Sequence, residues 1–466
     1  MADPGIVFAD EPLADRLPDP LFLGVDPGTL AVEHRQLQDA GRDLTDLDAE
    51  FETLITDPDA PDYHDRGTTL LDAGHTRPIR PDYPYEEPTA LPAIRARTPS
   101  NPVADTRLDR EAAAAAIHGG WVGACAGCLL GKPVQGWSRT RIADFLAASG
   151  QAPLDAYMHA DVDPAVAEEY AIHENLEPVD AFIDEVEGMP IDDDIDYIVV
   201  GLEALQRHGP ALDAVDIATT WLDTLPVFNT YTAERVAYRN LTDGLSPPAS
   251  ATHRNPYREM VGALIRADPW GYAALGDPEA AAALAHRDAT ISHTKNGVYG
   301  EMWAAAMIAA APVVDDMSTL VAAGLAQVPT TSRLAAAVQT VRDQIADGAD
   351  YPALAAAIHD RWDETSIYDW VHTLPNAQVI AAALLTSDGD FETAICRAVE
   401  TGFDTDSHAA TIGSILGAYH GIDALPRDWV DPLADRLDTS VPGVGPASIA
   451  DLAAATTDQR AARRGS

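Results

Sequence analysis

From Arg110 onward, apolar residues recur three and four positions apart, in long segments dominated by alanine. This spacing places the apolar side chains on one face of a helix, and alanine is the strongest helix former. The clearest segments are EAAAAAIHGGWVGACAGCLL, GEMWAAAMIAAA, SRLAAAVQTVRDQIA and AATIGSILGAY. Alternating strand patterns are nearly absent, so the sequence predicts an all-α fold, with its main domain at residues 111–445.

The two ends of the chain have a different pattern. Residues 1–110 are rich in proline and aspartate, with one helix-like stretch from about Leu30 to Thr56. A proline-dense connector, TRPIRPDYPYEEPTALP, follows and should be extended. We interpret residues 1–110 as an N-terminal extension that wraps the main domain, and residues 446–466 as a polar C-terminal tail.

The net charge of the chain limits the kinds of molecule that it is expected to bind. The 466 residues carry a formal net charge of −44, and Lys132 and Lys295 are the only lysines. Such a chain should repel nucleic acid and anionic membrane surfaces, so we expect neither as a partner. An acidic coat spread along the whole chain is typical of proteins from a salt-rich cytoplasm, where short screening lengths reduce self-repulsion. With no signal-peptide pattern and no long apolar run, we expect a cytoplasmic, salt-adapted protein.

Three cysteines, Cys125, Cys128 and Cys396, are too few for a disulfide framework. Cys125 and Cys128 have the spacing of a redox or zinc motif. However, they lie in the small-residue helical segment GACAGCLLG, with no further ligands nearby in the sequence. Buried packing side chains are therefore the favoured interpretation.

Three consecutive aspartates open a predicted helix in the segment PIDDDIDY. One aspartate is enough to cap a helix and to favour its dipole. Three neighbouring carboxylates cost on the order of 1 kcal/mol per pair at ~4 Å even in water, and a bound cation would remove that cost. Both a capping and a metal-binding role are open for Asp192, Asp193 and Asp194.

A second acidic segment, GFDTDSHAA, precedes the predicted helix AATIGSILGAY. The alternation places Asp404 and Asp406 on one side of an extended loop, beside the hydroxyl of Ser407. Hard cations prefer such oxygen ligands, although the segment is not an EF-hand loop. Two acidic helix starts suggest one site with two metal ions, but the spacing does not prove that they meet.

Four segments together resemble the ADP-ribosylglycohydrolase family, from about Ala112 to Trp429. They are GACAGCLLGKPVQGW, PIDDDIDY, the pair GALIRADPWG and RDATISHTKNGVYGEM, and GFDTDSHAATIGSILGAYHG. The resemblance implies an all-α fold with two Mg²⁺ ions, for which Mn²⁺ could substitute. It implies as metal ligands Asp192, Asp193, Asp194, Asp404, Asp406 and Ser407.

The sequence departs from the family pattern at several of these positions. Gln135 stands where many members have a glutamate close to the substrate, and an amide cannot act as a general base. Cys128 replaces an aspartate, and Asp192 stands where threonine is common. His408 and Phe403 replace asparagine and glycine. Metal binding is therefore better supported than efficient hydrolysis.

Candidate catalytic residues follow from the chemistry of N-glycosidic hydrolysis, which needs a positioned water, a base and electrostatic stabilisation. Asp193 is one candidate base. Glu301, flanked by apolar residues, is a second, or an ordinary helical charge. Gln135 is the third catalytic candidate, through a hydrogen bond to a substrate hydroxyl. The candidate substrate-binding residues are Arg266, His293 and Lys132.

Arg266 could pair with a phosphate of the ligand or form a structural salt bridge, and His293 could line the pocket or lie in the core. Three functions remain open at this level. The first is a metal-dependent glycohydrolase that acts on ADP-ribosylated protein, a small ADP-ribosyl compound or a nucleoside. The second is a weakly active ADP-ribose-binding module that keeps the metals. The third is a structural relative, against which the intact aspartate clusters argue.

Overall fold

The computed structural model describes residues 21–172 and 181–465. Within these ranges the chain forms 23 α-helices and one antiparallel strand pair, β1 (Arg436–Leu437) with β2 (Ala447–Ser448). The all-α prediction is confirmed. Residues 1–20 of the predicted extension and Ser466 of the predicted tail lie outside the described residues.

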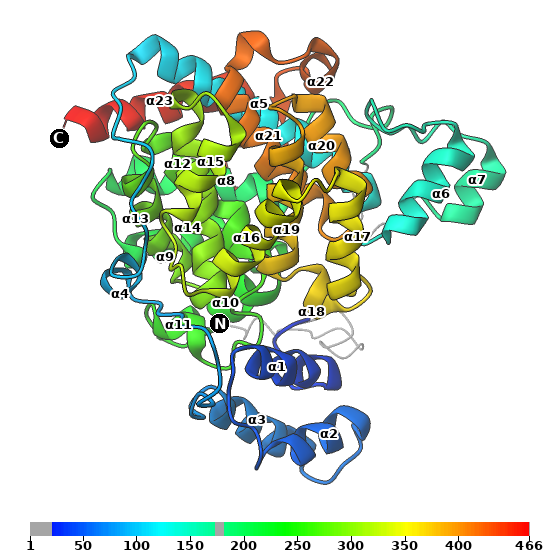
Figure 1. Cartoon of the computed structure of the whole chain (residues 1–466), viewed down its shortest axis with the longest axis vertical. Helices are drawn as coiled ribbons and strands as arrows, with labels where there is room; N and C mark the ends of the chain where they lie inside the picture. The colour runs from blue at the N-terminus through cyan, green and yellow to red at the C-terminus, as the bar shows by residue number, and fades with distance from the viewer. Residues whose placement is uncertain (1–20, 173–180, 466) are drawn as a thin grey trace, which may run out of the picture.

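The N-terminal helices gather at one end of the molecule, apart from the main helical body (Figure 1). They have a small core of their own, built around Leu30, Phe51 and Leu70. A long connector then runs to the main body. The helices at this end are α1 (Pro27–Asp39), α2 (Asp48–Thr56) and α3 (Tyr63–Gly74). Helix α4 (Leu91–Arg95) lies on the connector, and its Ile94 belongs to the core of the main body.

The main body contains the remaining helices. Its first part comprises α5 (Arg110–Gly131), α6 (Arg139–Ser149), α7 (Pro164–Tyr170), α8 (Asp193–His208), α9 (Ala214–Thr224), α10 (Thr232–Thr242), α11 (Ala249–Thr252), α12 (Asp268–Ala273), α13 (Pro278–Ala289) and α14 (Lys295–Ala310). Its second part comprises α15 (Met317–Leu325), α16 (Arg333–Ala346), α17 (Tyr351–Arg361), α18 (Ile367–Trp370), α19 (Thr373–Thr386), α20 (Phe391–Glu400), α21 (Thr405–His420), α22 (Arg427–Val430) and α23 (Ile449–Gly465). Short 3₁₀ turns lie at Lys132–Val134, Val227–Asn229, Val261–Arg266, Ala311–Val313, Ile422–Ala424 and Asp431–Leu433.

Helices α5 and α21 pack backbone against backbone at the centre of the body. A β-carbon added at Gly127 would lie only 2.0 Å from the carbonyl oxygen of Ala409, so glycine is required for this approach. At the end of α5, the hydroxyl of Thr405 donates to the carbonyl of Gly131 at 2.8 Å. The close packing therefore brings the last turn of α5 against the first turn of α21, where the second acidic motif lies.

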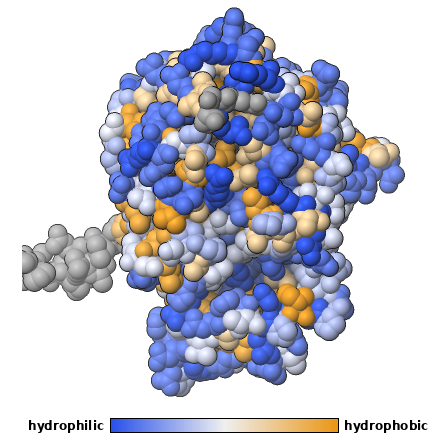
Figure 2. All heavy atoms as spheres, turned by 90° about the vertical axis from the view of Figure 1, so that its left-hand side faces the viewer, coloured by the Kyte–Doolittle hydropathy of each residue, from blue (hydrophilic) through white to orange (hydrophobic). Residues whose placement is uncertain are grey.

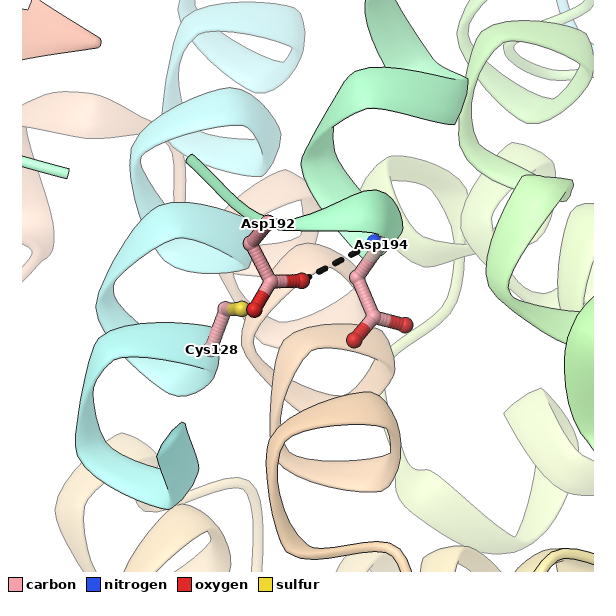
Figure 3. Close-up of side chains that lie close together, drawn as sticks. All are labelled: Cys128, Asp192 and Asp194. Atoms are coloured by element: carbon pink, nitrogen blue, oxygen red, sulfur yellow. Dashed lines mark hydrogen bonds between the residues drawn. The ribbon is translucent and has the colours of Figure 1, made fainter. Parts of the chain in front are cut away.

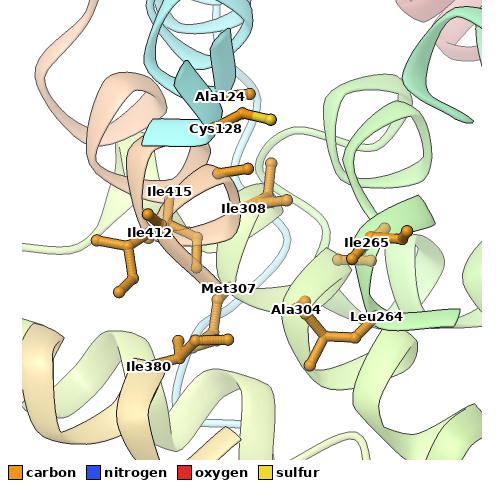
Figure 4. Packing of buried hydrophobic residues seen from close by; sticks show 14 of the residues in the cluster. Ala124, Cys128, Leu264, Ile265, Ala304, Met307, Ile308, Ile380, Ile412 and Ile415 are labelled. Atoms are coloured by element: carbon orange, nitrogen blue, oxygen red, sulfur yellow. The ribbon is translucent and has the colours of Figure 1, made fainter. Parts of the chain in front are cut away.

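The core surrounds this helix pair. Side chains of α5, α14, α19 and α21 meet there, among them Ala124, Met307, Ile308, Ile380, Ile412 and Ile415 (Figure 4). The span Arg110–Val134 is long and apolar enough to cross a membrane, but 83% of its most apolar window is buried inside the structure. Such burial is typical of the core helix of a soluble protein.

The single helix-like stretch expected from Leu30 to Thr56 is two helices. Helix α1 ends at Asp39, and Gly41 follows with a φ of +71°, in the left-handed region that favours glycine. The ring of Tyr83 from the connector packs where a side chain at this position would lie. Gly41 therefore ends the helix, and the spacing of polar residues that predicted one stretch does not reveal this end.

Buried ion pairs attach the N-terminal segment to the main body. Arg258 donates to Glu33 of α1 at 2.5 Å, and Arg333 of α16 donates to Glu87 of the connector at 2.9 Å. Arg333 also donates to Glu259 at 2.6 Å. Burial alone would raise the pKa of Glu259, but Arg333 and other cations hold it at about 2. These contacts join the N-terminal segment to the main body, while the division into an extension that wraps a main domain stays a prediction.

The segment expected to be a polar tail contains α23, which packs against α5. Trp121 of α5 donates its indole N–H to the hydroxyl of Thr456 at 3.1 Å. The helix buries Ile449, Ala453, Thr456, Thr457 and Arg460, so its inner face becomes polar after the first turns. The apolar periodicity of the sequence therefore stops although the helix stays packed.

Hydrophilic side chains cover most of the surface seen in Figure 2, with scattered apolar patches. This surface fits the acidic composition, in which acidic residues outnumber basic ones by 74 to 30. Adaptation to high salt stays a prediction.

Candidate functional site

The first acidic motif forms the N-terminus of α8. Asp192 is the N-cap, and its Oδ1 accepts a hydrogen bond from the backbone N–H of Asp194 at 2.9 Å. The side chains of Asp192 and Asp194 are buried, whereas Asp193 is half-buried. The capping role that the sequence left open is present at Asp192, but it uses only one of the three carboxylates.

The second acidic motif lies at the start of α21. Asp404 is the N-cap residue, and Phe403 before it has a φ of +60°, so the chain turns sharply into the helix. The Oγ of Ser407 lies 2.8 Å from Oδ2 of Asp404 and 3.3 Å from Oδ2 of Asp194. This hydroxyl joins the two motifs, so the acidic helix starts meet in space although 209 residues separate them in sequence.

The end of α5 supplies the third wall of the site. Lys132 donates from Nζ to Oδ2 of Asp192 at 2.6 Å, and both side chains are buried. The side chain of Gln135 hydrogen-bonds Asp404, which accepts because it is a carboxylate. Cys128 lies on the same helix, with its sulfur directed at the carboxylate of Asp192 (Figure 3). The helix pairing described above thus brings three segments of the chain to one site.

Burial and mutual repulsion dominate the electrostatics. Burial raises the pKa of Asp194 well above its ordinary value, and Asp192 and Asp406 raise it further. Burial also raises the pKa of Asp404, to about 6, although Ser407 opposes this rise with its hydrogen bond. The cluster therefore disfavours full ionisation on its own.

The donor set fits a divalent cation. Oδ1 of Asp194 is buried and has no hydrogen-bond partner among the described residues. A buried oxygen in this state costs free energy unless a ligand satisfies it. Carboxylates from both motifs and the Ser407 hydroxyl are the oxygen donors that hard cations bind. The buried cluster is thus compatible with metal binding.

Arg266, Glu301 and His293 lie together in a second buried cluster. Arg266 is 1% exposed; it donates to Glu234 and, from Nε, to Asp288 at 2.7 Å. Its Nη2 lies 3.6 Å from Glu301. Burial raises the pKa of Glu301 well above its ordinary value, and Asp288 adds to this.

His293 is fully buried, with Nδ1 2.8 Å from the hydroxyl of Ser292, which accepts from Arg266. These contacts match two alternatives that the sequence left open, a structural salt bridge for Arg266 and a position in the core for His293. They also favour the structural interpretation of Glu301, since its side chain is 0% exposed. The catalytic and substrate-binding roles of the three residues stay predictions.

Replacing Arg266 with methionine distinguishes a structural role of this residue from a role in binding the substrate. We expect stability to fall by about 3–5 kcal/mol, because the change leaves three buried acidic side chains without their shared cation. Thermal unfolding measures the loss, and KM for an ADP-ribosyl substrate should stay unchanged in the folded fraction. The matched control is Arg254→Met, which breaks the exposed pair with Asp72 and should cost no more than about 1 kcal/mol. An unchanged Tm with a raised KM would instead assign Arg266 to the substrate.

Cys128 and Asn376 also lie at the site, although the sequence analysis did not place them there. The donor atoms of Cys128, Asp192 and Asp194 all lie within 4.8 Å of one another. Asn376 of α19 accepts from the backbone N–H of Asp404 at 3.3 Å and lies 3.4 Å from the ring of His408. The replacement of a family aspartate was a signal for Cys128, whereas nothing in the pattern around Asn376 pointed to the site.

The sequence model of the ADP-ribosylglycohydrolase family matches residues 109–463. No curated protein sequence matches the chain. The solved structure of an ADP-ribosylglycohydrolase-related protein complex is 17% identical, with a TM-score of 0.48, and the match covers 76% of this chain and 99% of that one.

Proposed function

The chain belongs to the ADP-ribosylglycohydrolase family, and we propose that it hydrolyses an N-glycosidic bond to ADP-ribose or ribose with the help of two divalent cations. The observation that carries the proposal is the meeting of the two acidic helix starts through Ser407, at 2.8 and 3.3 Å from Asp404 and Asp194. A purely structural relative would have no need to bury so many like charges together.

The ions that suit this donor set are Mg²⁺ or Mn²⁺. When bound, such ions orient ribose hydroxyls and stabilise developing charge. The residues that would hold them are Asp192, Asp193, Asp194, Asp404, Asp406 and Ser407. Lys132 stays paired with Asp192 and places a positive charge beside this donor set.

Two half-buried residues of the site, Asp193 and Gln135, take part in proton transfer and hydrogen bonding. In the proposed reaction, the oxygen of a water attacks the anomeric carbon, and the glycosidic bond breaks with its electron pair passing to the leaving nitrogen, which takes up a proton from solvent. Asp193 is the carboxylate that accepts the proton from the water, since it belongs to the first motif and is not fully buried. Gln135 orients a hydroxyl or the water through its amide.

We infer that the substrates are ADP-ribosylated proteins or small ribosyl compounds, including nucleosides, in the cytoplasm. A net charge of −44 disfavours nucleic acid and anionic membranes as partners. The alternative function, a catalytically weak ADP-ribose-binding module, rests on Gln135, which cannot act as a base.

Turnover assays on the full chain test the proposal. Release of ADP-ribose or ribose is measured from ADP-ribosylated arginine peptides and from nucleosides, with Mg²⁺, Mn²⁺ or a chelator. We expect hydrolysis of at least one substrate that stops with the chelator. Binding of ADP-ribose without turnover of any substrate would favour the binding module, and neither binding nor turnover would reject both.

A further inference from the structure

A thiol lies inside the acidic cluster. Cys128 is fully buried on α5, and its sulfur lies with carboxylate oxygens of Asp192 and Asp194 in a group whose members are all within 4.8 Å of one another. Figure 3 shows the sulfur on α5 beside the carboxylate of Asp192, with Asp194 next to it at the start of α8. The proposed function accounts for the oxygens of this group but leaves the sulfur without a role.

Two observations indicate that this group binds a ligand. Oδ1 of Asp194 is buried without a hydrogen-bond partner in the described part of the chain, although its residue is only 2% exposed. Its Oδ2 receives only the long contact from Ser407, at 3.3 Å. A carboxylate held in this way has coordination capacity left over, and the sulfur of Cys128 is a donor within 4.8 Å of it.

The chemistry of the donors selects the ion. Mg²⁺ binds oxygen almost exclusively, and it keeps several waters. Thiolate ligands select softer ions, and Zn²⁺ and Co²⁺ accept a mixture of sulfur and carboxylate oxygen. An aspartate, which the family pattern has at this position, would favour Mg²⁺, whereas the cysteine of this chain favours a softer ion.

We propose that Cys128 is a metal ligand and that, with Asp192 and Asp194, it binds one borderline-soft divalent cation, such as Zn²⁺ or Co²⁺, in preference to Mg²⁺. This inference rests on the proposed function for the existence of a cation site at these motifs. On binding, the S–H bond breaks, the proton leaves to solvent, and the sulfur electron pair forms the bond to the metal. No change of oxidation state is involved.

Titration of the chelator-treated full chain with Co²⁺ alone, in the presence of a phosphine reductant, tests the inference. We expect an intense near-ultraviolet absorption from sulfur-to-cobalt charge transfer, which saturates with one ion. Cys128→Ser should lose this band. Cys125→Ser is the matched control, because it removes a buried cysteine from the same helix three residues away, and it should keep the band.

Selectivity gives a second measurement. Calorimetric titrations with Co²⁺ and Mg²⁺ should give a preference for Co²⁺ that falls at least about tenfold in Cys128→Asp, which restores an oxygen donor. If the variants at this position fail to fold by circular dichroism, X-ray absorption of the Zn²⁺-loaded wild-type protein decides instead. A sulfur shell at about 2.3 Å is expected there, and a shell of oxygen and nitrogen alone overturns the inference.

The outcomes separate this inference from the proposed function. Binding of Co²⁺ or Mg²⁺ without a charge-transfer band overturns the role of Cys128 but leaves the cation site intact. Absence of binding for every divalent ion tested overturns both. A band that survives Cys128→Ser and disappears in Cys125→Ser or Cys396→Ser places the sulfur ligand elsewhere and also overturns the inference.

Discussion

Replacing Asp404 with alanine is expected to abolish both the stabilisation of the protein by divalent cations and its hydrolytic activity. For the native protein, an ion at a hundredfold excess over Kd adds about 2.7 kcal/mol, or roughly 3 °C in Tm for a chain of this length. The variant should show no such shift, because it loses a buried carboxylate from the centre of the donor set. Cation stabilisation of charge contributes several kcal/mol to such reactions, so activity should fall about 10³-fold or more.

The metal-free variant is expected to be nearly as stable as the metal-free native protein. Burial raises the pKa of Asp404 to about 6, so its ionised form costs the native state stability when no cation is bound. Removing it also relieves repulsion on Asp194, whose pKa Asp404 helps to raise. Loss of the hydrogen bond from Ser407 opposes this gain.

Asp390→Ala is the matched control for Asp404→Ala. Asp390 is also an N-cap, on the neighbouring helix α20, where it accepts from the backbone N–H of Thr393 at 2.8 Å. Its loss should cost about 1 kcal/mol and leave the cation response intact. A Tm shift with Mg²⁺ or Mn²⁺ that is the same in Asp404→Ala as in the native protein would move the cation site elsewhere.

The sequence predicted the helical class because alanine-rich segments repeat at helical spacing over most of the chain. It did not predict that α1 and α2 separate, because the spacing of polar residues continues past Gly41, the left-handed residue that ends α1. It also missed helix α23, whose buried face includes Thr456 and Arg460. Periodicity reports apolar faces, so helices that bury polar side chains escape it.

Part of the candidate site was predicted from the resemblance to a family, and not from the spacing of residues. The resemblance placed both acidic motifs in one site, whereas spacing alone left their meeting open. Direct contact depends on the glycine-lined packing of α5 on α21, which brings Lys132 and Cys128 to the aspartates. The ion pairs of Arg266 were open at the level of sequence, because its partners Glu234 and Asp288 lie 32 and 22 residues away.

A carboxylate at position 135 is expected not to increase hydrolysis. In the structure the Gln135 side chain hydrogen-bonds Asp404 and helps to hold its pKa down. Gln135→Glu replaces this donor with a second acid beside a carboxylate that is already disfavoured in its ionised form. We therefore expect kcat to be unchanged or lower, while Asp193→Asn lowers it about 10²–10⁴-fold, the usual contribution of a general base.

Measured kcat values for the native protein, Gln135→Glu and Asp193→Asn, in saturating Mg²⁺ or Mn²⁺, then distinguish an enzyme from a binding module. The surface pair of Gln339 and Asp343, joined by a hydrogen bond of 2.7 Å, offers the matched control. Gln339→Glu makes the same chemical change at an exposed position and should leave kcat unaltered. If Gln135→Glu instead raises kcat at least about tenfold over a feeble native rate, the native chain lacks its base, because only a missing carboxylate at this position explains such a gain. The proposed role of Asp193 would then be wrong, and the chain would be a module that binds ADP-ribose and retains the cation site of its family.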